Sequence, residues 1–319
     1  METLTTLAGK VPTETAAYRY LEGLRWKGRP VCPHCGVIDG HYLMKARRRT
    51  STGKVTQRRL WKCHACRKQF SVLVGTIFHG SKIPVRTWLF VLFEMSASKN
   101  GIAAREVQRK YGLSPKSAWF LTQRIREAMI DRRPDALIGT IVADEAYIGG
   151  RSKLVHGRLM SDEKPEKRIP HKVPVLALLN RDTGEVRTKI VPSVTAVNLA
   201  ANIRAEVAMA KSALWTDEHP GYRVIGRKFG HGHSAVTHSM GEYVRGDVST
   251  NALENWFGQL KRSLDGTHHA VSPEHLHRYC EEFAFRFTTR KMSDTDRMDL
   301  LVHLAAGRRL MYRPLTEAA

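Results

Sequence analysis

Two Cys-x-x-Cys pairs near the N-terminus constrain the fold of this chain more than any other feature. The pairs are Cys32-Pro-His-Cys35 and Cys63-His-Ala-Cys66, and 27 residues separate them. Two such pairs suit two tight turns that present four thiolates to one tetrahedral Zn²⁺. We therefore expect a zinc ribbon in which Cys32, Cys35, Cys63 and Cys66 hold a structural zinc ion. The fifth cysteine, Cys280, stands apart in a predicted helix.

Disulfides and a redox dithiol are the competing interpretations of these cysteines. The first twenty residues contain no basic segment followed by an apolar one, so we expect an unexported, cytoplasmic protein, in which disulfides are rare. A thioredoxin-like motif would be single and would lie at a strand-to-helix turn. Zinc binding is therefore favoured, and His34 and His64 inside the pairs are expected to be ordinary turn residues.

The segment between the two cysteine pairs predicts a basic β-hairpin. Two arms, HYLMKARRRT and VTQRRLWK, flank a Ser-Thr-Gly-Lys turn. So many cations on a thin hairpin cannot pack into a core, and a phosphate backbone is their natural counterpart. The candidate DNA-binding residues of the hairpin are Lys45, Arg47, Arg48, Arg49, Arg58 and Arg59.

Net charge points to the same partner. The 319 residues carry a formal charge of +22, and residues 1–136 hold 26 Lys and Arg against 9 Asp and Glu, whereas residues 137–319 hold 26 against 21. Such an excess attracts polyanions and releases counterions from phosphates, so nucleic acid is the expected ligand. The longest apolar run, near residues 88–93, is far too short to span a bilayer, and we expect no membrane segment.

Residues 84–133 predict three helices. Pro84 opens the first, Lys99-Asn100-Gly101 ends it, and a Gly112-Leu113-Ser114-Pro115 turn separates the second from the third. Helix, short glycine-containing turn and helix is the pattern of a helix-turn-helix. Its last helix offers Lys116 and Arg124 as DNA contacts. A plain helical bundle with a solvated charged face is the alternative, because the turn pattern alone is a weak signal.

Two apolar segments each deliver an aspartate. Asp144 lies within the predicted strand LIGTIVADEAYI, and Asp217 ends the strand SALWTD. An unpaired buried carboxylate costs several kcal/mol, so Asp144 should have a partner, a cation or a metal. A strand-end carboxylate such as Asp217 is common in active sites and is also common as a turn cap.

A third carboxylate follows on a predicted amphipathic helix. Ser249-Thr250-Asn251 can cap a helix from residue 252 to 264, on which Glu254 and Lys261 share one face. Glu145 and Asn255 are neighbours of the chosen residues, and alternation allows only one of each pair to face the site. We favour Asp144 and Glu254. Three converging carboxylates repel one another unless divalent cations lie between them, which predicts a Mg²⁺ or Mn²⁺ site at Asp144, Asp217 and Glu254.

The remaining pattern predicts the fold class. Residues 171–191 predict a hairpin, and a helix around 195–210 precedes the Asp217 strand. This order of elements is typical of a ribonuclease H-like α/β fold with a mixed sheet. We divide the chain into a zinc ribbon with its basic hairpin (1–80), a helical, helix-turn-helix-like DNA-binding region (81–136), a ribonuclease H-like catalytic domain (137–292) and a C-terminal tail (293–319).

Four longer motifs resemble those of one family. ADEAYIGG, TDEHPGY, HSMGEYVRGDVSTNALENWFGQLKR and GTHHAVSPEHLHRYCEEFAFRFTTR are similar to motifs of bacterial insertion-sequence DDE transposases that carry an N-terminal zinc ribbon. The resemblance covers the ribbon, the helical region and most of residues 137–290. It implies that Asp144, Asp217 and Glu254 form the catalytic metal-binding triad, and that Lys261 is the family's basic residue.

The sequence therefore predicts a DNA transposase. We expect it to bind the terminal inverted repeats of an insertion sequence and the target DNA, and to cut and rejoin strands with two divalent ions. Bringing two ends together implies a homodimer or larger assembly, associated with the bacterial nucleoid. Two rivals are a nuclease of the same fold that does not join strands, and a zinc-ribbon DNA-binding regulator with a silent catalytic domain.

Overall fold

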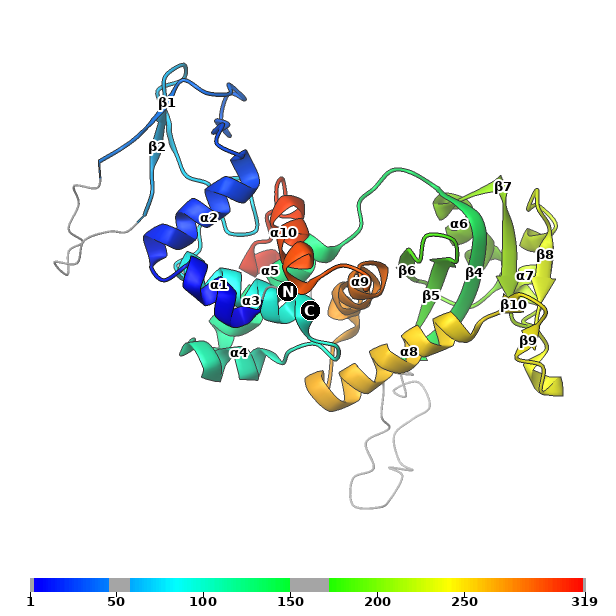
Figure 1. Cartoon of the computed structure of the whole chain (residues 1–319). Coiled ribbons are helices and arrows are strands. Elements are labelled where there is room, and N and C mark those ends of the chain that lie inside the picture. Colours follow the sequence, from blue (N-terminus) through cyan, green and yellow to red (C-terminus); the bar gives the residue numbers. More distant parts are fainter. Residues whose placement is uncertain (1–2, 46–57, 150–171, 318–319) are drawn as a thin grey trace, which may run out of the picture. The chain divides into compact units, whose positions relative to one another are not determined.

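The computed structural model describes residues 3–45, 58–149 and 172–317, and the chain forms two compact units (Figure 1). The first unit combines residues 1–129 with residues 289–319, and the second contains residues 130–288. The structure thus groups residues differently from the four-part division made on the sequence. The ribbon and the helical region share one unit, and the predicted C-terminal tail belongs to that unit as well.

The first unit begins with two helices and the ribbon. Thr13 caps the second helix by accepting a hydrogen bond from the backbone N–H of Ala16. The ribbon is a three-stranded antiparallel sheet in the order β1-β2-β3, so the predicted hairpin arms do pair, while the hairpin tip lies outside the described residues. The elements are α1 (Leu4–Lys10), α2 (Glu14–Trp26), β1 (His41–Leu43), β2 (Trp61–Cys63) and β3 (Gln69–Phe70).

Five further helices complete this unit: α3 (Val85–Ala97), α4 (Ala104–Tyr111), α5 (Pro115–Met129), α10 (Asp294–Leu304) and α11 (Tyr312–Glu317). The three helices predicted for residues 84–133 are present. Helix α10 packs against α2, α3 and α5, and its Met298, Leu301 and Val302 are fully buried. The C-terminal segment is therefore part of the core of the first unit.

The second unit is built on a mixed five-stranded sheet in the order β6-β5-β4-β7-β8. Strands β4, β5 and β6 are antiparallel neighbours, whereas β7 and β8 run parallel to β4. This arrangement confirms the predicted ribonuclease H-like α/β class. The strands are β4 (Leu137–Ile148), β5 (Val173–Asn180), β6 (Val186–Ile190), β7 (Val207–Thr216) and β8 (His233–Ala235).

Two apolar cores lie against the two faces of this sheet, because side chains alternate along each strand. On one face, Val142 and Ala146 of β4 pack against α8 and α9. On the other, Ile141 and Ala143 pack against α6 and α7. The remaining elements are α6 (Ala196–Glu206), α7 (Gly221–Gly226), η2 (His238–Met240), β9 (Val244–Arg245), β10 (Val248–Ser249), α8 (Asn251–Ser263), the π-helix η3 (Leu264–His268) and α9 (Pro273–Thr288).

None of the helices in the described part of the chain has the length and apolar character needed to cross a membrane.

Candidate zinc centre and carboxylate site

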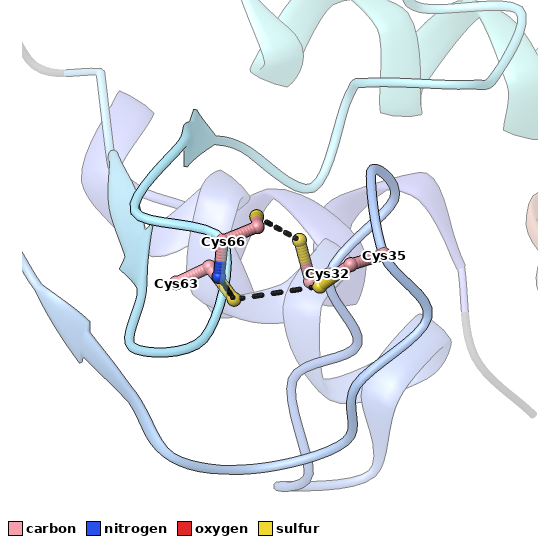
Figure 2. A group of neighbouring side chains, drawn as sticks. All are labelled: Cys32, Cys35, Cys63 and Cys66. Atoms are coloured by element: carbon pink, nitrogen blue, oxygen red, sulfur yellow. Dashed lines mark hydrogen bonds between the residues drawn. The ribbon is translucent and has the colours of Figure 1, made fainter.

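The four ribbon cysteines form a compact cluster (Figure 2). Their sulfur atoms all lie within 4.8 Å of one another, with 3.7 Å between Cys32 Sγ and Cys66 Sγ and 3.6 Å between Cys35 Sγ and Cys63 Sγ. A tetrahedral zinc with bonds of about 2.3 Å requires sulfur separations of about 3.8 Å, whereas a disulfide bond is about 2.05 Å long. The cysteines are free thiols, and their geometry fits a structural zinc.

The two cysteine turns have the same backbone hydrogen bonds although their sequences differ. The N–H of the first cysteine donates to the carbonyl five residues later, as Cys32 does to Val37 and Cys63 to Lys68. The fourth residue after each first cysteine has a positive φ, 74° at Gly36 and 59° at Arg67. This conformation reverses the chain so that both thiols of a pair point to the same centre.

The N–H of Cys66 is 3.5 Å from Cys63 Sγ, and this hydrogen bond lowers the pKa of Cys63 to about 6. The thiolate is the form that binds a metal, so the local backbone favours zinc binding. His34 is exposed, and its Nε2 lies 3.3 Å from the carbonyl oxygen of Gln69. Neither His34 nor His64 is part of the sulfur cluster, in agreement with their expected role as turn residues.

The basic residues predicted for the hairpin lie in different settings. Lys45 and Arg58 are exposed, whereas Arg47, Arg48 and Arg49 lie outside the described residues. Arg59 is mostly buried, and its Nε donates to Glu22 Oε2 at 2.9 Å. Trp61 Nε1 donates to the other oxygen of the Glu22 carboxylate, also at 2.9 Å. Arg59 therefore joins the ribbon to α2, which is a structural role that the sequence pattern did not reveal.

The structure also corrects the assignment of Arg124 as a DNA contact. Its side chain lies between the rings of Trp88 and Phe120, and its Nη2 donates to the carbonyl of His79 at 2.6 Å. Only 4% of Arg124 is exposed, and burial lowers its pKa to about 10. Residues 121–129 of α5 are all buried, so this part of the helix faces the core and cannot enter a DNA groove. Lys116 at the start of α5 is exposed.

Sheet register brings the two aspartates together. In the parallel pair β4 and β7, Val142 is the partner of Trp215. Asp144 follows two residues later within β4, and Asp217 follows two residues later, directly after the end of β7 at Thr216, so the two aspartates lie near one another. Val142 packs into the α8 and α9 core, and alternation along β4 directs Asp144 toward that face of the sheet, while the charge of Asp217 acts on the pKa of Asp144.

The raised pKa of Asp144 indicates a carboxylate that would be stabilised by a nearby positive charge. Burial raises its pKa to about 7, and the negative charges of Glu145, Asp217 and Glu254 add to this effect. Its carboxylate accepts a 2.8 Å hydrogen bond from the N–H of Glu145. Within the described residues, no lysine or arginine forms an ion pair with Asp144 or Asp217. A hard divalent cation would supply the missing charge, and carboxylate oxygens are its preferred ligands.

Glu254 lies in the first turn of α8, which packs against β4 (Figure 1). Its Oε1 accepts a 2.8 Å hydrogen bond from the Thr250 hydroxyl and lies 3.3 Å from His238 Nε2. Lys261, two turns further along α8, is exposed. The predicted helix and its capping region are therefore present, although Thr250 uses its hydroxyl for Glu254 and not for capping.

The carboxylates are close enough to affect one another but are not as tightly packed as the cysteines. Among the described residues, the cysteine cluster is the sole group of three or more potential ligands with all atoms within 4.8 Å. Asp217 and Glu254 both act on the pKa of Asp144, so the three carboxylates lie near one another without forming so tight a group. Their donor set fits Mg²⁺ or Mn²⁺, ions that commonly keep water and substrate oxygens as further ligands.

The neighbour of Asp144 faces the opposite side of the sheet. Glu145 accepts a hydrogen bond from the Tyr222 hydroxyl and has its Oε1 4.0 Å from His219 Nδ1. Burial raises the pKa of Glu145 and raises that of Tyr222 well above its ordinary value. His219 also donates its backbone N–H to Asp217 Oδ1 at 3.0 Å. This arrangement supports Asp144 as the residue that faces α8, and it shows supporting residues that the sequence did not single out.

Two family models match the chain on either side of the helical region. Residues 136–288 match the ISXO2-like transposase domain, and residues 12–69 match the transposase zinc-ribbon domain of the same IS1595 group. The chain belongs to the insertion-sequence transposases with an N-terminal zinc ribbon. Both cysteine pairs of the transposase lie within the ribbon match, and all three carboxylates lie within the domain match.

A curated relative and a solved structure are also similar to this chain. A protein of Halobacterium salinarum described as an uncharacterized protein in transposable element ISH50 is 26% identical over 284 residues, covering 86% of this transposase and 90% of the relative. A crystal structure of a pre-cleavage Mos1 transpososome is 12% identical and covers 64% of this chain and 77% of that one, with a TM-score of 0.20. That TM-score is too low to establish a common fold.

Proposed function

We propose that this transposase binds the terminal inverted repeats of its insertion sequence and catalyses divalent-metal-dependent cleavage and transfer of DNA strands. Asp144, Asp217 and Glu254 hold the metal, and Lys261 contacts the DNA backbone beside it. The observation that carries this proposal is the register of β4 and β7, which brings Asp144 in β4 near Asp217 directly after β7, with Glu254 on α8, the helix that packs against β4.

Each residue has a defined task in this proposal. Asp144, Asp217 and Glu254 would hold two divalent ions, which would supply activation of the attacking oxygen and stabilisation of the leaving oxygen in an in-line phosphoryl displacement. The three carboxylates fix the position of that charge. The His219 backbone N–H donates to Asp217 Oδ1, and the Tyr222 hydroxyl donates to Glu145, the neighbour of Asp144. Lys261 offers a positive charge to a phosphate two helical turns from Glu254.

The first unit provides the DNA-binding surface in this proposal. The strong positive charge of residues 1–136, the exposed Lys45 and Arg58 of the ribbon, and Lys116 at the start of α5 support this assignment. A stable zinc ribbon gives these cations a fixed surface. Because two element ends must meet before joining, the active form is a dimer or a larger assembly.

Substitution of Asp217 tests the catalytic part of the proposal, with its neighbour Glu218 as the matched control. Glu218 faces elsewhere, and its carboxylate accepts hydrogen bonds from Ser239. Asp217→Asn is expected to reduce excision by more than about 100-fold, because even outer partners of metal ligands are worth 10- to 100-fold. Glu218→Gln is expected to stay within a few-fold of the wild type, and both variants should bind element ends normally.

The same assay separates the rivals. Excision that persists in Asp217→Asn would contradict the proposed metal site. Cleavage without joined products in the wild type would favour a nuclease, and end binding with neither cleavage nor joining would favour a regulator. Gel separation of cut and joined products from a labelled element end distinguishes these outcomes.

A further inference from the structure

The N-terminus of α8 departs from the usual capping arrangement. Thr250 occupies the cap position but has helical backbone angles, φ −97° and ψ −6°, and its side chain makes no capping hydrogen bond. A threonine cap is typically worth about 1 kcal/mol of helix stability. The buried Thr250 hydroxyl instead donates to Glu254 Oε1 at 2.8 Å. The helix thus gives up a stabilising interaction in favour of a contact to the Glu254 carboxylate.

His238 reaches the same point from η2, twelve residues earlier in the chain. Its Nε2 lies 3.1 Å from Thr250 Oγ1 and 3.3 Å from Glu254 Oε1. The Thr250 proton is directed at Glu254, and a carboxylate is an acceptor, so Nε2 must carry a hydrogen to satisfy both neighbours. The Tyr243 ring, 5.1 Å from the imidazole ring, packs beside it. This packing limits rotation of His238.

These two contacts address a specific weakness of Glu254 as a metal ligand. The Glu254 side chain is 44% exposed, so without partners it would sample several rotamers. Fixing a free glutamate side chain costs up to about 2 kcal/mol of conformational entropy. Hydrogen bonds to an ionised carboxylate are among the stronger ones in proteins. Both contacts converge on Oε1, which leaves Oε2 outside this pair of interactions and available to a cation.

We propose that Thr250 and His238 are positioning residues that hold the Glu254 carboxylate in place for the divalent cation shared with Asp144 and Asp217. This inference rests on the proposed function, because it assumes that Glu254 is a metal ligand. Neither Thr250 nor His238 touches the reacting DNA in this role. They act through Glu254, in the way that outer hydrogen-bond partners orient metal ligands and raise metal affinity by 10- to 100-fold.

The test compares Mn²⁺ binding and excision for paired substitutions in the full chain. Free Mn²⁺ is measured by electron paramagnetic resonance during titration of zinc-loaded protein. Thr250→Val and His238→Ala are each expected to weaken Mn²⁺ binding about 10-fold. They should also raise the Mn²⁺ concentration needed for half-maximal excision by a similar factor, with a smaller change in the rate at saturating Mn²⁺.

Conservative variants and a remote histidine control for loss of structure. Thr250→Ser keeps the hydroxyl and should restore Mn²⁺ affinity to within a few-fold of the wild type, a rescue that a purely structural role of the methyl group would not produce. His231, which is exposed and outside this cluster, serves as the matched control, and His231→Ala should bind Mn²⁺ normally. Thermal melting identifies any variant that does not fold. If Thr250→Val or His238→Ala does not fold, the Mn²⁺ affinity of Thr250→Ser decides the result.

Glu254→Gln distinguishes a failure of the proposed function from a failure of the positioning role alone. Full excision and Mn²⁺ binding in Glu254→Gln would overturn the proposed function itself. An inactive Glu254→Gln combined with wild-type Mn²⁺ binding in Thr250→Val and His238→Ala would overturn the positioning role alone. Weakened binding in all three variants with rescue by Thr250→Ser is the result expected here.

Discussion

The zinc centre and the carboxylate site are assembled in different ways. The ribbon sulfurs come from two short turns with the same hydrogen bonds and lie within 4.8 Å of one another. The carboxylates come from a strand, the residue after another strand and a helix, spread over more than a hundred residues, and they form a less compact group. A local backbone motif thus prepares the first site for its ion, whereas sheet topology only gathers the second. The first geometry suits a permanent structural ion, whereas the proposed function requires the second to admit metal, water and DNA oxygens in turn.

Loss of the zinc centre should have the largest effect. Cys63→Ser removes a buried thiolate, and zinc binding contributes about 10–16 kcal/mol to the folding of small zinc domains. We expect the variant to lose zinc, measured by elemental analysis, and to lose DNA-end binding, while the Mn²⁺ affinity of the second unit stays unchanged. Cys280→Ala, at the buried cysteine outside the ribbon, should keep its zinc. A wild-type protein that contains no zinc would contradict the assignment of the ribbon cysteines as a zinc centre.

Substitution of Asp144 should have a smaller effect on stability than loss of the zinc centre, and it should stabilise the fold. The pKa of Asp144 in the fold, about 7, lies above the ordinary value of 3.8, so the folded state binds the proton more tightly than the unfolded state. This contribution to the free energy of unfolding is present at low pH and is lost as the pH rises from about 4 through 7. Asp144→Asn removes the ionisation, and without added divalent ions it should raise the melting temperature at pH 8 by a few degrees.

The pH dependence is the control for this prediction. At pH 5.5, midway through the range from about 4 to 7, only part of the contribution has been lost, so Asp144→Asn should gain roughly half as much there as at pH 8. Asp265→Asn, at an exposed carboxylate, should show no such difference. Equal gains for Asp144→Asn at both pH values would mean that burial of the charge is not the cause.

The smallest effects concern the two cations predicted on α5. Lys116 is exposed, so Lys116→Gln should weaken binding to element ends several-fold and reduce the salt dependence of binding by about one ion. Arg124→Gln should instead lower thermal stability, by about 1–3 kcal/mol, because it leaves the His79 carbonyl without its donor. Fluorescence anisotropy across salt concentrations, combined with thermal melting, checks both. A changed salt dependence in Arg124→Gln would restore it as a DNA contact.

Features that depend on neighbouring residues in sequence were predicted well. The cysteine spacing predicted the ribbon cluster, and apolar runs predicted the central strands and the hairpin that became β5 and β6. The helix that carries Glu254 and Lys261 was also found. Alternation required a choice between Asp144 and Glu145, and the structure directs Asp144 toward α8 and Glu145 toward Tyr222.

Features that depend on tertiary packing were not predictable in this way. A positive charge on a helix predicts contact with solvent or DNA, yet Arg124 is itself buried. It donates to the carbonyl of His79, and its guanidinium lies near the rings of Trp88 and Phe120. The contacts of Thr250 and His238 with Glu254 depend on the path of the chain through β9 and β10. The segment called a tail did carry a helix signal, since Ser293 caps α10 by accepting a hydrogen bond from the N–H of Asp296.

Residues 289–319 belong to the first unit, so the second unit, residues 130–288, is an insertion within the sequence of the first. A fragment that stops before residue 289 would lack the Arg297 contact to the Ser96 carbonyl and the Arg308 contact to the Glu127 carbonyl, both within the first unit. To express the first unit alone, residues 130–288 should therefore be deleted and replaced by a short linker. A simple C-terminal truncation would leave the core of the first unit incomplete.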